Sequence, residues 1–332
     1  MGPVRDARTV HVLLPNDIDD PAAPSGGNAY DRRVCDGLAA LGWAVREHPA
    51  RGGWPAPARG ARDALGALLA GLPERAIVLA DGLVASGAPE VVAAHAGRLR
   101  LAVLVHMPVG GTAERAMLAG AAAVITTSEW TRGRLALPDA RVAAPGVDSA
   151  PAATGSPAGT ALLCVAAVLP HKGHDVLAAA LEIAGLGCTC VGSVTRDPHF
   201  VAGLRGSGRL RFAGVRTGPE LDAAYAAADL LVLPSRAETY GMVLTEALAR
   251  GIPVLASAVG GVPEALGTTP DGPPGMLVPP GDVAALAAAL RAWRDGAALR
   301  DRLRAAALAR RGTLRGWADT ASRISEVLGG LR

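Results

Sequence analysis

The stretch Asp229–Glu264, DLLVLPSRAETYGMVLTEALARGIPVLASAVGGVPE, encodes a strand, a loop, a helix and a second strand in succession. An apolar run at Leu230–Pro234 predicts a buried strand, and the polar residues that follow it predict a loop. A helix is expected to begin near Gly241, and the apolar run at Pro253–Ala256 predicts the next strand. Continuous apolar strands joined by a helix are typical of a parallel sheet that is covered on both faces.

The same alternation of apolar runs and amphipathic stretches extends over the rest of the chain. Further apolar runs that predict strands lie at Val10–Leu14, Ala76–Ala80, Leu101–His106, Ala123–Thr127, Leu162–Val168, Thr189–Gly192 and Leu210–Ala213. Stretches that predict helices lie at Tyr30–Leu41, Ala61–Leu69, Thr112–Leu118, Asp175–Ala184, Glu220–Ala228, Val283–Trp293 and Ala318–Leu328. A segment rich in Pro, Gly and Ala between residues 147 and 160 has the composition of a linker. We therefore expect two doubly wound α/β domains, residues 1–150 and 151–332, with a ligand cleft at the carboxyl ends of their strands.

The composition of the chain limits the classes of protein to which it can belong. Half of the 332 residues are apolar (50%) and 19% are charged, as in a folded globular protein. The sequence has no run long enough for a membrane span and no signal-peptide pattern, so we expect a cytoplasmic protein without stable membrane insertion, which leaves peripheral association open. The four cysteines form no CxxC pair, which predicts reduced thiols. A net charge of +3 and an aromatic content of 3% argue against nucleic acid as a partner.

Lysine is almost absent from this sequence. Lys and Arg total 33 residues, and Lys172 is the single lysine among them. In an arginine-rich background, a lone ammonium favours a site that needs a compact charge with three donors rather than a planar fork. Composition alone leaves open the alternative that one lysine survived by chance.

The predicted helix of the opening stretch begins where an anion could bind. Its first-turn amides, those of Gly241, Met242 and Val243, would have no carbonyl partners within the helix. Together with the helix dipole, these amides form a site suited to a diphosphate. Gly241 has no Cβ, so a phosphate can approach its backbone closely.

Two glutamates flank this helix start. Glu238 lies in the preceding loop, and Glu246 lies eight positions further on, inside the predicted helix. Beside a diphosphate, Glu246 could accept from ribose hydroxyls and Glu238 from sugar hydroxyls. The alternative is that Glu238 is a solvated loop residue and that Glu246 pairs with Arg250 on an exposed helix face.

The segment from Glu238 to Val254, ETYGMVLTEALARGIPV, resembles the retaining GT-B glycosyltransferases of family 4 (glycosyl transferases group 1), whose signature is two glutamates separated by seven residues. The similarity continues through Ala258–Glu264 and Gly275–Val278. It implies a GT-B fold, with an acceptor-binding N-terminal domain and a nucleotide-sugar-binding C-terminal domain, both Rossmann-like, facing a cleft. In the family the first glutamate contacts the donor sugar and the second contacts the ribose, which implies these roles for Glu238 and Glu246.

A second resemblance places the lone lysine in the donor site. Leu169–Leu177, LPHKGHDVL, is similar to the family segment in which a lysine neutralises the donor phosphates, and Lys172 falls on that position. Many members carry Gly-Arg just before this loop, where this chain has Ala166–Ala167. Arg236, or a cation from the first domain, could replace the missing arginine.

The first half of the chain resembles the family more loosely. Gly26 and Gly27 follow the first strand and resemble the family's Gly-Gly loop that faces the donor phosphates, although a turn without a ligand is the alternative. His106 ends an apolar strand run, at the edge of the sheet that faces a ligand cleft. The family often has a histidine here, near the sugar, which favours a catalytic role over a hydrogen-bonded core histidine. The last helix, about residues 317–332, resembles the family's closing helix and is expected to pack on the first domain.

Two further charged groups have an alternative to a ligand role. Asp17 and Asp19 form the Asp-x-Asp triplet that binds metal in the other main glycosyltransferase fold, and carboxylates suit Mg²⁺ or Mn²⁺. Because the second half already supplies a phosphate site, we expect no metal. Arg32 and Arg33 could meet an anionic lipid or a phosphorylated acceptor, or form a solvated helix face.

These resemblances imply transfer of a sugar from a UDP- or GDP-sugar to an acceptor hydroxyl, with retention of configuration and with neither metal nor another cofactor. Lys172, Glu238 and His106 are the expected catalytic residues. The donor is expected to contact Gly26, Gly27, Lys172, Val215, Glu238, Gly241, Met242, Val243 and Glu246. The acceptor would be a sugar, a lipid-linked molecule or another small molecule. The alternatives are a nucleotide-sugar epimerase of GT-B shape and a degenerate protein that binds a nucleotide sugar without activity.

Overall fold

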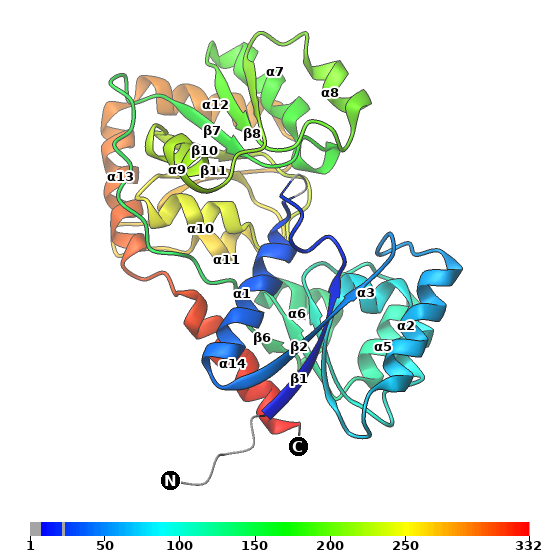
Figure 1. Ribbon diagram of the computed structural model, residues 1–332. Coiled ribbons are helices and arrows are strands. Elements are labelled where there is room, and N and C mark those ends of the chain that lie inside the picture. The colour runs from blue at the N-terminus through cyan, green and yellow to red at the C-terminus, as the bar shows by residue number, and fades with distance from the viewer. Residues whose placement is uncertain (1–7, 22–23, 332) are drawn as a thin grey trace. The chain divides into compact units, whose positions relative to one another are not determined.

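The computed structural model describes residues 8–21 and 24–331 of the chain (Figure 1). It contains two compact units: the first comprises Met1–Gly146 with Gly316–Arg332, and the second comprises Val147–Arg315. The chain therefore leaves the first unit and later returns to it. The last helix, α14 (Trp317–Gly330), belongs to the first unit although it follows the whole of the second in sequence.

The first unit is built on a parallel sheet of six strands. Its strands, in the order β2-β1-β3-β4-β5-β6, are β2 (Trp43–Ala50), β1 (Arg8–Pro15), β3 (Ile77–Asp81), β4 (Arg100–Val105), β5 (Ala123–Thr126) and β6 (Arg141–Val142). Its other helices are α1 (Gly26–Ala40), α2 (Arg59–Gly71), α3 (Gly82–Gly87), α4 (Pro89–Ala93), α5 (Thr112–Gly120) and α6 (Glu129–Leu135). The strand order reverses between β1 and β3, which makes this point the topological switch of the sheet.

Helix α14 packs against α1 at very short range. A Cβ on Gly37 of α1 would lie 2.4 Å from the Cβ of Ala321, so only glycine allows the two helices to approach this closely. Two hydrogen bonds hold α14 in place: Trp43 Nε1 donates to Ser325 Oγ at 2.9 Å, and Thr320 Oγ1 donates to the carbonyl of Ala144 at 2.8 Å. The C-terminal helix is therefore an integral part of the first unit's core.

The second unit repeats the same construction with a different strand order. Its parallel strands, in the order β12-β11-β10-β7-β8-β9, are β12 (Gly275–Val278), β11 (Val254–Ser257), β10 (Leu230–Leu233), β7 (Leu162–Val165), β8 (Cys188–Val191) and β9 (Leu210–Gly214). Its helices are the 3-10 helix η1 (Pro170–Lys172), α7 (His174–Ala184), α8 (Pro198–Leu204), α9 (Gly218–Ala226), α10 (Met242–Ala249), α11 (Val262–Leu266), α12 (Val283–Asp295) and α13 (Ala297–Arg311). Here the strand order reverses between β7 and β10.

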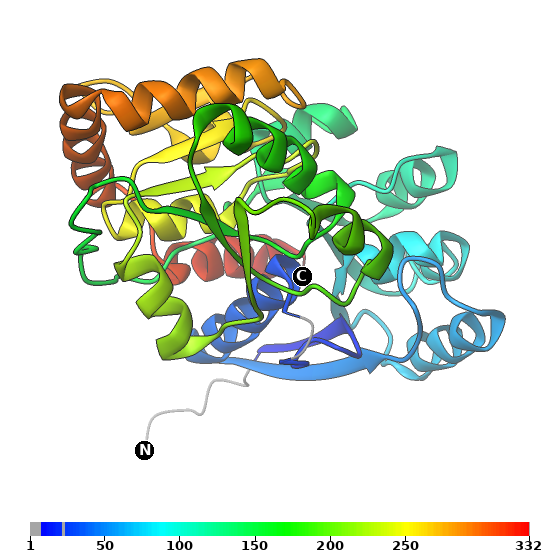
Figure 2. The ribbon, with the colours of Figure 1, turned by 90° about the horizontal axis from the view of Figure 1, so that it is seen from above.

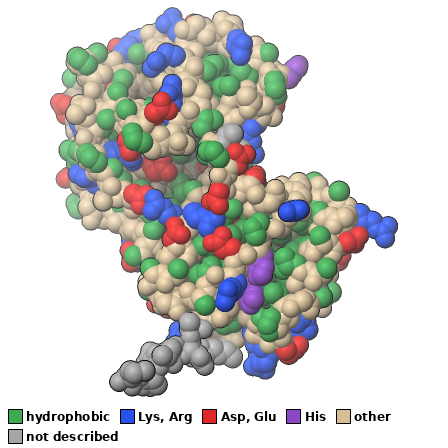
Figure 3. All heavy atoms as spheres, viewed as in Figure 1, with side chains coloured by type: hydrophobic (Ala, Val, Ile, Leu, Met, Phe, Trp, Pro, Cys, Tyr) green, Lys and Arg blue, Asp and Glu red, His purple; other side chains and the backbone are tan. Residues whose placement is uncertain are grey.

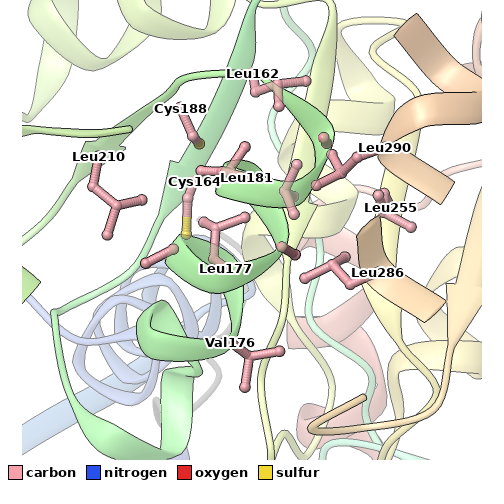
Figure 4. Close-up of a cluster of buried hydrophobic side chains, with 14 of the residues drawn as sticks. Leu162, Cys164, Val176, Leu177, Leu181, Cys188, Leu210, Leu255, Leu286 and Leu290 are labelled. Atoms are coloured by element: carbon pink, nitrogen blue, oxygen red, sulfur yellow. The ribbon is translucent and has the colours of Figure 1, made fainter. Parts of the chain in front are cut away.

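Two apolar layers enclose the second sheet. On one face, side chains of α7, α8 and α12 pack on the strands, and Figure 4 shows Leu177 and Leu181 of α7 between the strands and Leu286 and Leu290 of α12. Helices α7 and α12 lie side by side on this face in both views of the ribbon (Figures 1 and 2). On the other face, α9, α10 and α11 supply the packing residues. The strands are therefore buried on both sides, which explains why their sequences are apolar without alternation.

The predicted fold class, two doubly wound α/β domains, is confirmed by these two parallel sheets. Several elements escaped sequence-based prediction, among them β2, β6, β12, α8 and α13. Positive and negative side chains are interspersed on the face shown in Figure 3. None of the helices in the described part of the chain combines the length and the apolar character that a bilayer crossing requires.

Candidate active site

Two neighbouring strand ends define the centre of the second unit's sheet. β7 and β10 pair in parallel, and the helices that follow them, α7 and α10, cover opposite faces of the sheet. The loops after the two strands therefore diverge from one edge, and such a switch point leaves room for a ligand. Lys172 lies in the first loop, and Glu238 lies in the second.

Lys172 and Glu238 form a close ion pair across the two loops. The ammonium Nζ of Lys172 lies 2.9 Å from Oε1 and 2.7 Å from Oε2 of Glu238. The Lys172 side chain is 22% exposed and that of Glu238 is 12% exposed, so the pair is partly shielded from water but remains accessible. Glu238 is thus not a solvated loop residue, and the structure brings together two of the residues singled out in the sequence.

Arg236 braces the same two loops. Its backbone amide donates to the carbonyl of His171 at 2.7 Å, and its guanidinium donates to the carbonyl of Pro170 at 2.8 Å. The guanidinium also makes a bidentate ion pair with Asp175, with both N–O distances at 2.7 Å. This pairing lowers the pKa of the Asp175 carboxyl. The sequence suggested Arg236 as a substitute for a phosphate-binding arginine, but in the structure its guanidinium is occupied in fixing the Lys172 loop.

The helix start predicted near Gly241 lies beside this ion pair. Gly241 precedes α10 with a φ of 95°, in the left-handed region, and a Cβ there would lie 3.5 Å from Cγ of Glu238. No side chain caps the N-terminus of α10. The first-turn amides, including those of Met242 and Val243, have no carbonyl partner within an α-helix, so this end of α10 can serve an anion.

Gly260 packs closely against the backbone of the Glu238 loop. With a φ of 59°, it lies so close to the loop that a Cβ would be 1.6 Å from the carbonyl oxygen of Glu238. The neighbouring Gly261 is equally tight, because its Cβ would lie 2.2 Å from the carbonyl oxygen of Thr239. The sequence contains this glycine pair in the block that resembles the family, but its role in holding Glu238 is visible only in three dimensions.

Glu246 lies one turn into α10 and is held by a different neighbour. Tyr225 Oη donates to its Oε2 at 2.7 Å. Burial raises the pKa of Glu246, and the Tyr225 bond and the Arg250 charge oppose that rise. Arg250 donates to the backbone carbonyl of Glu246 at 3.0 Å, stacks 4.5 Å above the Tyr225 ring and pairs with Asp222 at 2.5 Å.

Strands β9 and β7 end at the same edge of the sheet. Val215, an expected donor contact, follows β9, and Ala166–Ala167 follow β7, where many family members carry Gly-Arg. Gly214 ends β9 with a φ of 72°, directly before Val215, and its carbonyl accepts from Gly192 at 2.8 Å. Ala166–Ala167 follow β7 and offer no charge. A cation near this loop that the sequence analysis did not single out is Arg196. The pKa of His171 is lowered, because desolvation and the charges of Lys172 and Arg196 outweigh the opposing charge of Glu238.

In the first unit, His106 forms a buried cluster with two aspartates. It directly follows β4, and its Nε2 lies 2.7 Å from Oδ1 of Asp31 and 3.6 Å from Oδ2 of Asp81. Gly27, at the start of α1, is close to this ring, because a Cβ there would be 3.6 Å from His106 Cδ2. Asp31 and Asp81 were not among the predicted site residues, although Asp81 directly follows the apolar run Ala76–Ala80.

Asp19 of the acidic triplet in the first unit forms an ion pair. Asp19 makes a bidentate contact with Arg32, with N–O distances of 3.0 and 2.7 Å, and Arg32 also pairs with Glu47 at 2.7 Å. The backbone carbonyl of Asp17 accepts from Asn28 Nδ2 at 3.0 Å. Arg32 is therefore engaged with two acidic side chains rather than solvated.

All four cysteines are buried and free. Cys164 and Cys190 face each other across the paired strands β7 and β8, close to the buried His174. Burial raises the pKa of Cys35 to about 12. These thiols pack as small apolar side chains within the cores.

Comparison with known proteins connects this geometry to a family. Residues 159–295 match the family described as Glycosyl transferases group 1. This stretch includes both loops at the β7–β10 switch point, with Lys172, Glu238 and Glu246. A curated relative, the D-inositol 3-phosphate glycosyltransferase of Thermomonospora curvata, is 36% identical over 197 residues, which is 52% of this chain and 43% of the relative. The match thus covers less than half of that relative's own length.

Solved glycosyltransferase structures share the fold over nearly the whole chain. Sucrose-phosphate synthase from Thermosynechococcus elongatus superposes with a TM-score of 0.73 at 22% identity, covering 98% of this chain and 99% of that one. Alr3699/HepE of Anabaena, solved in complex with UDP-glucose, gives a TM-score of 0.76 at 17% identity, covering 97% and 99%. At such identities the likeness concerns the fold. The resemblance drawn from the sequence is confirmed: residues 159–295 match Glycosyl transferases group 1, and the chain shares the fold of solved GT-B glycosyltransferases.

Proposed function

We propose that this chain is a glycosyltransferase that moves a sugar from a UDP- or GDP-sugar to an acceptor hydroxyl with retention of configuration. The observation that carries the proposal is the Lys172–Glu238 ion pair, which lies beside the uncapped start of α10 at the β7–β10 switch point. A cation and free amides suit a diphosphate, and a carboxylate suits sugar hydroxyls. The family match over this segment supports the same assignment.

In this proposal, donor binding exchanges the partners of the ion pair. The diphosphate takes the Lys172 ammonium and the amides of Gly241, Met242 and Val243. Glu238, released from Lys172, accepts hydrogen bonds from the hydroxyls of the donor sugar. Because both groups are already partly desolvated, they are ready to bind at a low desolvation cost.

The reaction breaks the bond between the anomeric carbon and the diphosphate oxygen and forms a bond from that carbon to the acceptor oxygen. The acceptor approaches from the face that the diphosphate leaves, and its proton passes to a diphosphate oxygen. Lys172 and the first-turn amides stabilise the charge that grows on the leaving diphosphate. From the first unit, His106 and the N-terminal end of α1 at Gly26 and Gly27 are proposed to contact the donor; these glycines begin the helix rather than forming the loop expected from the sequence.

A panel of donors provides the direct test of this proposal. We expect the sugars of one base among UDP-, GDP-, ADP- and dTDP-sugars to raise the melting temperature. A ligand at about 100 times its Kd stabilises the folded protein by about 2.7 kcal/mol. The stabilising donor is then incubated with the protein without an acceptor, and its sugar is identified afterwards. A changed sugar indicates epimerisation, whereas transfer requires an acceptor. If no donor raises the melting temperature, the proposed function is wrong.

Transfer is expected to proceed at an unchanged rate in the presence of EDTA, because Lys172 and backbone amides neutralise the diphosphate in place of a metal. The measurement is the initial rate with and without EDTA, followed by addition of Mg²⁺ or Mn²⁺. Loss of activity that Mn²⁺ restores would contradict metal independence and would direct attention to Asp17 and Asp19.

Glu246 is proposed to hold the ribose of the donor. Glu246→Ala is expected to weaken donor affinity by about 10- to 100-fold, because a charged hydrogen bond contributes about 1.5–3 kcal/mol. Tyr225→Phe serves as the matched variant: it removes the 2.7 Å bond to Glu246 and leaves the ring beneath Arg250. Tyr225→Phe should lower the donor affinity less than Glu246→Ala does. Equal donor affinities in the wild type and both variants would remove Glu246 from the site.

A further inference from the structure

Three ionisable side chains of the first unit meet in a largely buried cluster. Asp31 comes from α1, Asp81 ends β3 and His106 follows β4. Both aspartates are 3% exposed, and His106 is 11% exposed. The proposed transfer mechanism assigns no task to either aspartate, and burying two carboxylates is costly unless something compensates for it.

Each carboxylate is oriented by its own element. Oδ1 of Asp81 caps α3 by accepting from the amides of Leu83 at 2.8 Å and Val84 at 3.0 Å, so its Oδ2 is the oxygen toward His106. Oδ1 of Asp31 contacts His106 Nε2 at 2.7 Å, whereas its Oδ2 is buried without a hydrogen-bond partner in the described part of the structure. Because Oδ2 of Asp31 has no such partner, the contact with the imidazole is what compensates most for burying this carboxylate.

The imidazole ring cannot easily turn away from these carboxylates. The Tyr30 ring packs against it edge-on, with the ring centroids 4.9 Å apart. Gly27 also lies close to the ring, because a Cβ there would be 3.6 Å from His106 Cδ2. Tyr30 is itself fixed, because its hydroxyl donates to the carbonyl of Ala143 at 2.8 Å. With Nε2 committed to Asp31, Nδ1 is the ring nitrogen that remains for a ligand.

We propose that Asp31 and Asp81 are positioning residues that keep His106 as an imidazolium and aim its Nδ1–H as a fixed hydrogen-bond donor to a substrate hydroxyl oxygen. This role rests on the proposed glycosyl transfer. A neutral histidine in the same place would present either a lone pair or a proton at Nδ1, depending on its tautomer. Two carboxylates at Nε2 remove that ambiguity, because only the cation carries a proton on both nitrogens.

Electrostatics agree with this geometry. Burial opposes the charged form of His106, but the charge and hydrogen bond of Asp31 and the charge of Asp81 outweigh it, so the pKa of His106 is raised. Burial and the charge of Asp31 raise the pKa of Asp81 to about 7. The Tyr30 hydroxyl stays neutral, because burial raises its pKa well above the usual value.

The test is a histidine NMR titration of the full chain. The chain has seven histidines, and the ring signal that is lost in His106→Gln is that of His106. Its midpoint is expected above the ordinary value of about 6.5 and should fall by about one pH unit or more in Asp31→Asn, since the amide keeps the shape but removes the charge. Asp36→Asn, which changes an exposed aspartate on the same helix, should leave the midpoint unchanged.

A second variant guards against misfolding of the first. Asp81→Asn retains a good N-cap for α3 and should lower the midpoint less than Asp31→Asn does. A midpoint that is the same in wild type, Asp31→Asn and Asp81→Asn would overturn the proposal. So would a change in the His106 signal on adding EDTA, because a bound cation would then link the three groups.

The activity measurement is kept separate from the NMR measurement. In the wild type, kcat is expected to fall on the alkaline side as His106 loses its proton, and Asp31→Asn should move that fall to lower pH. If the NMR midpoint moves and the rate profile does not, His106 has no role as a donor and the proposal is wrong. If the wild type transfers no sugar from any donor, the proposed function fails, and the NMR midpoint still reports whether the aspartates hold the proton.

Discussion

Lys172→Met is expected to lower kcat/KM for glycosyl transfer by about 10²- to 10³-fold. Methionine keeps most of the volume of the lysine stem but supplies no charge to a leaving diphosphate. The neighbouring guanidinium of Arg236 is committed to Asp175, and Ala166–Ala167 offer no substitute. The measurement is a steady-state assay with the donor that raises the melting temperature.

The single variant leaves Glu238 without its partner at 12% exposure, and an unpaired carboxylate there could destabilise the loop. The double variant Lys172→Met/Glu238→Gln removes both charges. We expect its melting temperature to return toward that of the wild type while transfer remains lost, because both groups are needed by the substrate. Wild-type rates in either variant would contradict the assignment of the donor site to this ion pair.

Gly260→Ala is expected to produce the largest loss of stability among single substitutions near the site, about 2–4 kcal/mol, together with loss of donor binding. Alanine at a φ of 59° is strained, and its Cβ would lie 1.6 Å from the Glu238 carbonyl oxygen, a distance that no side-chain adjustment can relieve. The Glu238 loop must move, and the carboxylate moves with it. Thermal melts and donor titrations on the same preparation measure both effects.

Gly281→Ala is the matched control for this substitution. Gly281 also has a positive φ, of 76°, but nothing lies within 4 Å of its Cβ position. It should therefore show only the cost of the backbone conformation, about 1 kcal/mol, with donor affinity preserved. Equal losses in the two variants would mean that the contact with the Glu238 loop is of no consequence.

The central strands could be predicted because a parallel sheet buries them on both faces. Leu230–Leu233 of β10 and Arg100–Val105 of β4 are almost entirely buried, and their apolar runs stand out in the sequence. β2 lies at the edge of its sheet, with three exposed residues among its eight, and its sequence WAVREHPA carries no apolar run. Helix α13 is rich in arginine, and most of its apolar residues are alanines, which mark a buried face only weakly.

The site was predictable where one short segment carries it. The loop with Glu238 and the helix start at Gly241 are contiguous, and Lys172 stands out because it is the chain's single lysine. Asp31 and Asp81 could not be recognised in this way, because they contact His106 only in the folded chain. Asp31, for example, lies 75 positions before His106 in the sequence. The contact of Gly260 with the Glu238 carbonyl is likewise a property of backbone proximity, which no residue type encodes.

The return of α14 to the first unit has a consequence for biosynthesis. During translation, every residue of the second unit is synthesised before the helix that packs beside Gly37 and Trp43. The first unit therefore keeps the α1 surface exposed until α14 has been made and released. A released chain that ends before residue 317 would carry a second unit with all of its elements and a first unit without its closing helix, and the uncovered α1 surface is where chaperones should bind.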